Sequence, residues 1–190
     1  TLSSQDREVD ESKLFLMAAR QEAKAGWTKK AIRRYENYLK KKPDDHAVEL
    51  EFADYLQDSG NYRNAAAHYD FLIEKMGTVT DGKDSYAKKL MLNAARNAIK
   101  NKKGDRAIAY YMRALLFDES DFALAEEVAG IFAGQEKYGE ALELCDKILL
   151  HDPQNRGVLL LKINLLVCLK KYAEAGEAID QVPYEERNQK

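Results

Sequence analysis

Residues 77–83, with the sequence GTVTDGK, have the glycine and lysine spacing of a phosphate-binding loop. In such loops a serine or threonine follows the lysine, because its hydroxyl binds the magnesium ion that accompanies the phosphates. This chain has Asp84 at that position, and its negative charge would oppose phosphate. A strand should also precede the loop, and no strand pattern is present there. We therefore interpret residues 77–83 as a connection between elements and expect no cofactor.

The histidines and cysteines do not form a metal or catalytic motif. His46, His68 and His151 lie far apart, and none has a second histidine or cysteine three or four residues away. We expect them on the surface or in turns. Cys145 and Cys168 are too few for the disulfide framework of a small secreted fold, and we interpret Cys145 as a core residue, with a bridge to Cys168 as the alternative. No nucleophile motif or zinc-binding helix is present, so we expect no enzyme activity.

The composition is that of a soluble globular protein, with 45% hydrophobic and 33% charged residues among 190. The net charge is −2, so the basic surface of a nucleic-acid-binding protein is missing. The longest apolar stretch, residues 158–169, contains a lysine and an asparagine and is too short to span a bilayer. It predicts a buried helix and no membrane insertion. The chain begins at Thr1 without a leader pattern, and we expect it to be part of a longer protein whose compartment, cytoplasmic or periplasmic, stays open.

An internal repeat organises the chain. A small residue beside similar turn and aromatic residues recurs at separations of 34, 42, 34 and 34, and these markers are Ala31, Ala65, Ala107, Ala141 and Ala175. A period of 34 residues is typical of helical repeats, in which each unit buries its apolar face by stacking on its neighbours.

We predict five helical hairpins between a polar lead-in (residues 1–11) and a C-terminal tail (183–190). The separation of 42 places an insertion at 80–87, so one helix should end near Met76 and the next should begin near Asp84. The predicted units are 12–45, 46–79, 88–121, 122–155 and 156–182.

The recurring residues resemble those of the tetratricopeptide repeat family. The signature of that family places an aromatic or apolar residue four positions after the small residue and a proline near the end of each repeat. The pairs Ala31 with Tyr35, Ala65 with Tyr69 and Ala107 with Tyr111 match it fully. In the last two units Cys145 and Ile179 replace the aromatic residue. The family's aromatic residue in the turn appears as Tyr62, Tyr138 and Tyr172, and its closing proline appears as Pro43 and Pro153. The resemblance implies an all-α, right-handed superhelical solenoid of about five hairpins.

By the same resemblance, the first helix of each unit lines a concave groove that binds a partner. Its residues alternate in bands, basic in units one and three, acidic in units two and four, and apolar in unit five, although ordinary solvated charge is an equal alternative. We expect Arg20 and Lys24 to face Asp54 and Asp58. The predicted partner-binding residues are Lys13, Arg20, Lys24, Glu51, Asp54, Asp58, Lys89, Asn93, Arg96, Lys100, Glu126, Glu127, Leu160, Leu161 and Asn164.

The leading hypothesis is a non-catalytic scaffold that docks a partner protein or peptide segment. A narrower alternative, based on analogy of fold alone, is a periplasmic module of a machine that exports polysaccharide or assembles pili or outer-membrane proteins. An RNA-reading array of 35-residue repeats is disfavoured by the 34-residue period and the net charge. The family's clamp for chaperone tails is not reproduced, because Leu16 and Arg20 replace its first lysine and asparagine. At the C-terminal helix, where Ile179 and Val182 would be uncovered, we expect either a further helix of a longer protein or self-association with a second copy.

Overall fold

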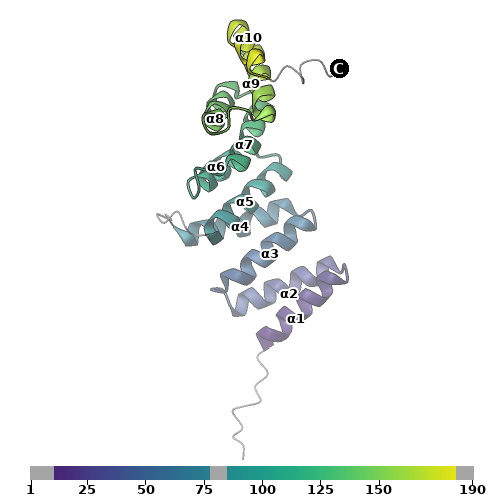
Figure 1. The fold of residues 1–190 in the computed structure, drawn as a ribbon. Coiled ribbons are helices and arrows are strands. Elements are labelled where there is room, and N and C mark those ends of the chain that lie inside the picture. The colour runs from purple at the N-terminus through teal and green to yellow at the C-terminus, as the bar shows by residue number, and fades with distance from the viewer. Residues whose placement is uncertain (1–10, 78–84, 183–190) are drawn as a thin grey trace, which may run out of the picture. The chain divides into compact units, whose positions relative to one another are not determined.

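A computed structural model describes residues 11–77 and 85–182, which form ten α-helices and contain no β-strand (Figure 1). The predicted all-α class is confirmed. The helix that precedes the insertion ends at Met76, as predicted. The next helix is described from Ser85, and its predicted start near Asp84 lies outside the described residues, as does most of the phosphate-loop-like segment, 78–83. The helices are α1 (Glu11–Lys24), α2 (Thr28–Lys41), α3 (His46–Asp58), α4 (Tyr62–Met76), α5 (Ser85–Lys100), α6 (Gly104–Leu115), α7 (Phe122–Gly134), α8 (Tyr138–His151), α9 (Arg156–Cys168) and α10 (Tyr172–Gln181).

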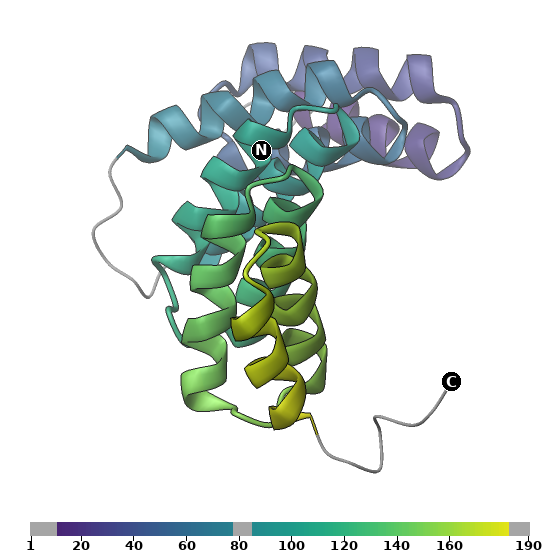
Figure 2. The ribbon, with the colours of Figure 1, turned by 90° about the horizontal axis from the view of Figure 1, so that it is seen from above.

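The chain divides into two compact units. Among the described residues, the first contains α1 to α4 together with residues 96–101, and the second contains residues 85–95 and α6 to α10. In the first unit α1 packs on α2, α2 on α3, and α3 on α4. In the second unit each helix from α6 to α9 packs on the next, and α7 also contacts α9. Figure 2 shows α9 and α10 side by side at the end of the second unit.

Three of the first helices of the hairpins begin with the same side-chain cap. A carboxylate or amide oxygen accepts a hydrogen bond from the backbone N–H three residues later, which satisfies a donor that has no partner within the helix. The capping residues stand at corresponding positions of the repeat. Asp45 Oδ1 accepts from the N–H of Val48 at 3.2 Å, Asp121 Oδ1 from the N–H of Leu124 at 3.0 Å, and Asn155 Oδ1 from the N–H of Val158 at 3.1 Å.

The turn inside each hairpin reverses the chain through one residue in the left-handed conformation. Gly26 and Gly60 have φ of 73° and 78°, and the corresponding residues Lys102, Glu136 and Lys170 have φ between 56° and 61°. After Gly60, the N–H of Asn61 donates to the carbonyl of Leu56 at 2.8 Å, and Gly60 N–H donates to Gln57 at 3.0 Å. These two bonds close the end of α3.

We expect Gly60→Ala to lower the free energy of unfolding by about 1 kcal/mol, because a side chain strains the left-handed backbone. An added Cβ would meet no atom within 4 Å, so crowding contributes nothing. Gly130 in the interior of α7 is the matched control: it also has open space, but its φ is not positive. There the same substitution should raise stability by about 0.5–1 kcal/mol. Urea denaturation should show changes of opposite sign in the free energy of unfolding for the two variants. Changes of the same sign would contradict the left-handed conformation of Gly60.

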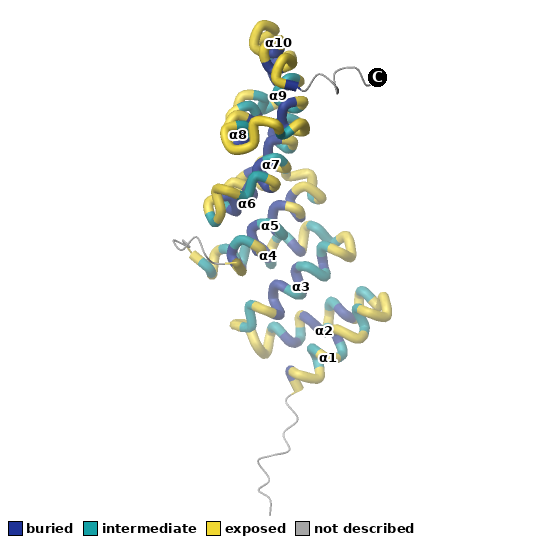
Figure 3. The backbone as a smooth tube through the Cα atoms, viewed as in Figure 1, coloured by how far each residue is buried: buried dark blue, intermediate teal, exposed yellow. Residues whose placement is uncertain are grey.

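The predicted repeat residues form the contacts between helices. Ala31, Ala65, Ala107 and Ala141 are fully buried, and Ala175 is 3% exposed. The buried stretches, dark blue in Figure 3, lie along α3, α7 and α9, where neighbouring helices pack. Alanine lets two helix backbones approach closely, and the aromatic one turn later fills the adjoining space.

Two expectations about particular residues are corrected. Val182, expected to be uncovered, is buried and has an extended backbone after the end of α10, whereas Ile179 is 45% exposed, as expected. His68, expected on the surface or in a turn, is partly buried within α4, with its Nδ1 2.6 Å from Glu49 Oε1. The sequence had not indicated this pair because Glu49 lies on the preceding helix.

The cysteines do not form the alternative disulfide. Cys145 and Cys168 are both free, the first buried and the second exposed. Burial raises the pKa of the Cys145 thiol to about 11, so the thiol stays protonated near neutral pH. Cys145 therefore acts as a small apolar core residue at the position that Tyr35, Tyr69 and Tyr111 occupy in earlier hairpins.

Candidate functional site

The residues predicted to bind a partner lie on α1, α3, α5, α7 and α9, the first helices of the hairpins. Several basic and acidic side chains among them are exposed and form no hydrogen bond or ion pair within the described residues. Asn93 and Glu126 are partly buried. The exposed, unpaired charged residues are Lys13, Lys24, Asp58, Lys89, Arg96 and Lys100.

Arg20 and Glu51 form a two-point ion pair between α1 and α3. Arg20 Nε donates to Glu51 Oε1 at 2.8 Å, and Nη2 donates to Oε2 at 2.6 Å. The Tyr35 hydroxyl donates to the same Oε1 at 2.7 Å. Arg20 was expected to face Asp54, so this part of the prediction is wrong. The pair ties the first hairpin to the second.

Two further carboxylates of the predicted surface accept hydrogen bonds from buried tyrosines. The Tyr69 hydroxyl donates to Asp54 Oδ1 at 2.6 Å, and the Tyr111 hydroxyl donates to Glu127 Oε1 at 2.8 Å. Burial, and secondarily the Asp54 carboxylate, raise the pKa of Tyr69, so it remains a donor. A buried hydroxyl needs such a partner, and these acids therefore have a structural role.

The acidic band of unit four, on α7, and the apolar band of unit five, on α9, meet where these two helices are in contact. Glu126 Oε1 lies 2.8 Å from the place where a Cβ on Gly157 would stand, so the carboxylate covers the first turn of α9. That position suits a negative charge, because the amino end of a helix is positive. Further along α9, Leu160 is 44% exposed, Asn164 is exposed and Leu161 is partly buried.

We expect Glu51→Gln to lower the free energy of unfolding near pH 7 by about 1 kcal/mol, since the pair is half exposed. The Arg20 guanidinium, and to a lesser degree the Tyr35 hydroxyl, hold the pKa of Glu51 below its ordinary 4.5 although burial opposes them. The charged form therefore stabilises the fold fully above pH 4.5, and this contribution is lost as the pH falls through the lowered pKa.

The measurement is urea denaturation of both proteins near pH 7 and near pH 3, where the difference should shrink. Glu36→Gln is the control, because Glu36 is exposed on α2 and has no ion pair in the described part of the chain. A difference that stays constant between the two pH values would contradict the ion pair.

Residues 132–190 match the family model of the tetratricopeptide repeat. This C-terminal segment, which contains α8 to α10, carries the tetratricopeptide repeat. No curated protein matches the sequence of the chain. Tyr35, Tyr69 and Tyr111 lie outside the matched segment, at the recurring aromatic position of the internal repeat, and each donates a hydrogen bond to a carboxylate of a first helix.

Solved structures with the tetratricopeptide repeat fold resemble most of the chain. A structure of MamA is 14% identical, with a TM-score of 0.65 over 90% of this chain and 88% of its own. YrrB, a tetratricopeptide repeat protein with an unusual peptide-binding site, is 15% identical, with a TM-score of 0.62 over 88% and 82%. A tetratricopeptide repeat protein from Parabacteroides merdae is 13% identical, with a TM-score of 0.65 over 94% and 68%. At these identities the likeness shows the fold.

The described residues contain neither a cluster of metal ligands nor a helix that could span a membrane. No group of three or more histidine, cysteine, aspartate or glutamate side chains is placed to hold a metal ion in residues 11–77 and 85–182. Within the same ranges, every helix is too short or too polar to cross a bilayer.

The prediction from sequence missed three exposed apolar residues on the second helices or directly after one of them. Met112 is 40% exposed, Leu116 is 71% exposed and Leu150 is 81% exposed. A signal was available in the repeat register, because the position of Met112 is aspartate or glutamate in the other four copies: Glu36, Asp70, Asp146 and Asp180.

Proposed function

We propose that this chain is a non-catalytic scaffold that docks a segment of a partner protein on the exposed faces of its first helices. The observation that carries the proposal is α9, which is apolar on two sides. Val158, Leu159, Leu165 and Leu166 are buried in the second unit, yet Leu160 and Val167 on the other side are 44% and 47% exposed. A helix that is apolar all round is normally covered.

The exposed residues of α9 form one stripe. Leu160, Asn164 and Val167 are four and three residues apart, so they share one face of the helix. The two apolar side chains would contact apolar groups of a partner. The Asn164 amide, which can both donate and accept, would bind the backbone of an extended peptide. Such a surface suits a protein segment better than a single small ligand.

The helix α5 offers a second recognition feature. Lys89, Arg96 and Lys100 are seven and four residues apart and therefore share a face, and no described carboxylate pairs with them. A row of unpaired cations raises the association rate of an acidic partner, most strongly at low salt. The unusual peptide-binding site of YrrB, a protein with the same fold, supports a peptide partner.

The test is capture of partners from a lysate of the source organism by the purified chain and its variants. Leu160→Glu with Val167→Glu, and separately Arg96→Glu with Lys100→Glu, should remove the captured protein while the melting temperature changes by no more than about 2 °C. The control is Lys29→Glu with Arg33→Glu on α2, a second helix. Both residues are exposed, and neither forms an ion pair within the described residues. Capture that survives both first-helix variants would contradict the proposal.

A further inference from the structure

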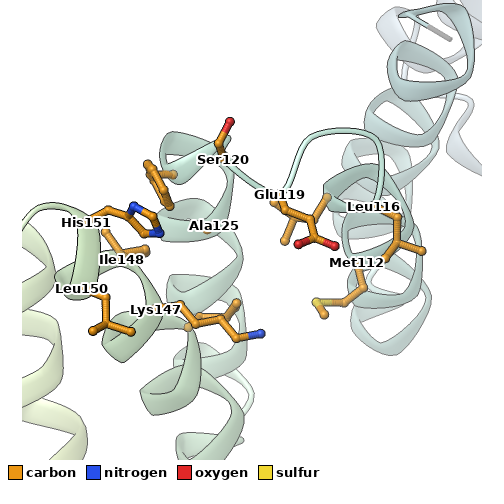
Figure 4. A pocket seen from close by; sticks show the side chains of 12 residues that line it. Met112, Leu116, Glu119, Ser120, Ala125, Lys147, Ile148, Leu150 and His151 are labelled. Atoms are coloured by element: carbon orange, nitrogen blue, oxygen red, sulfur yellow. The ribbon is translucent and has the colours of Figure 1, made fainter. Parts of the chain in front are cut away.

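The second unit has an open hollow of about 480 Å³ between α6, α7 and α8. Met112 and Leu116 line it from the α6 side and Leu150 lines it from α8 (Figure 4), and Phe122 of α7 is also part of its lining. Leu116 and Leu150 are 71% and 81% exposed. Large apolar side chains at this exposure around a concave surface are typical of a protein-interaction site.

In the repeat register, other copies carry charged residues at the positions that line the hollow, whereas the fifth copy has Tyr184 where Leu116 and Leu150 stand. The position of Leu116 and Leu150 is occupied by Lys40 and Glu74 in the first two copies, at separations of 34, 42 and 34. Met112 likewise stands where the four other copies have an acid. The fold therefore accepts charged residues at these positions, and the architecture of the repeat does not require apolar ones.

The rim of the hollow also carries two opposite charges. Lys147 on α8 and Glu119 in the α6–α7 connection both line it, and neither forms an ion pair within the described residues. In Figure 4 the Lys147 ammonium points into the space between the two sides. An occupant with a carboxylate near Lys147 and a basic group near Glu119 would match these charges.

We infer that the hollow binds an amphipathic segment of another protein, one that presents large apolar side chains flanked by an acidic and a basic residue. A ligand small enough to lie inside the hollow would leave Leu116 and Leu150 on the rim exposed, whereas a peptide covers both. A lipid surface fits less well, because it would take the unpaired Glu119 carboxylate out of water. This surface lies on other residues than the first-helix surface and does not depend on it.

The experiment selects ligands from a phage-displayed library of random peptides about twelve residues long, using the whole chain as bait. The enriched peptides should share two large apolar residues and an adjacent acid. Their affinity, measured by fluorescence anisotropy of the synthetic peptides, should fall at least about tenfold for Leu116→Glu with Leu150→Glu. Because Glu74 occupies the corresponding position in another copy, these variants should fold, which circular dichroism checks.

Two controls separate the contributions. Lys147→Glu should weaken the peptides while Lys103→Glu, an exposed lysine of the same unit, should not. Leu160→Glu with Val167→Glu should also leave peptide binding unchanged, so that this inference and the proposed function fail independently. Peptides that bind the Leu116→Glu, Leu150→Glu protein as tightly as the unsubstituted one would overturn the inference. The inference would also be overturned if sedimentation showed a dimer and the Leu116→Glu, Leu150→Glu variant were monomeric. That result would show that a second copy covers the hollow.

Discussion

Replacing Tyr69 with alanine is expected to lower the free energy of unfolding by about 3–5 kcal/mol, the largest effect of a single substitution that we predict. Tyr69 is 1% exposed and fills the space between α3 and α4 beside Ala65. Truncation removes the ring and leaves a cavity that the rigid helical pair cannot close. It also removes the hydroxyl that donates to Asp54. Urea denaturation followed by circular dichroism measures the loss.

Two variants separate the causes of this effect. Tyr69→Phe keeps the ring and removes only the hydrogen bond, so it should cost about 1–2 kcal/mol. Tyr172→Ala makes the same truncation at a tyrosine that is 66% exposed, and it should change stability by no more than about 0.5 kcal/mol. If Tyr172→Ala were as costly as Tyr69→Ala, the assignment of Tyr69 to the core of the hairpin would be wrong.

Ala65→Leu is expected to destabilise the protein by about 1–3 kcal/mol through overpacking. Ala65 is fully buried at the place where α4 meets α3, and the extra carbon atoms have no free volume. The added apolar surface cannot compensate, because the helices must move apart to accept it. The same change at Ala141, also fully buried, should have a similar effect on the second unit.

Ala67→Leu is the matched control, on the same helix and with the same added side chain. Ala67 is exposed, and leucine has nearly the helix propensity of alanine, so stability should change by less than about 0.5 kcal/mol. The midpoint of urea denaturation distinguishes the two variants. Equal midpoints for Ala65→Leu and Ala67→Leu would contradict the packing register derived from the repeat.

The first-helix acids show how structural and recognition roles divide within one predicted surface. Glu51, Asp54 and Glu127 each accept a hydrogen bond from a buried tyrosine, so changing them would disturb the fold as well as any partner contact. Lys89 and Arg96 have no such role in the described structure. Experiments on docking should therefore use the basic residues of α5 and the exposed apolar residues of α9.

The sequence by itself determined the fold class, the end of α4 at Met76 and the core positions. A repeat makes this possible, because Ala65 and Tyr69 recur with the same spacing in several copies, and each copy repeats the evidence of the others. Local signals were also sufficient at the turns. Gly60 marks the reversal between α3 and α4 because its backbone conformation is a property of a few neighbouring residues.

Only the tertiary structure decided which side chains meet. Arg20 was expected to face Asp54 on the basis of helix register, yet it binds Glu51, because the outcome depends on how α1 and α3 cross and on where the Tyr35 hydroxyl lies. Side-chain partners on different helices are set by angles and offsets between helices, which spacing along one helix does not contain. The hollow beside Leu116 is of the same kind, since three helices define it and no single segment of sequence does.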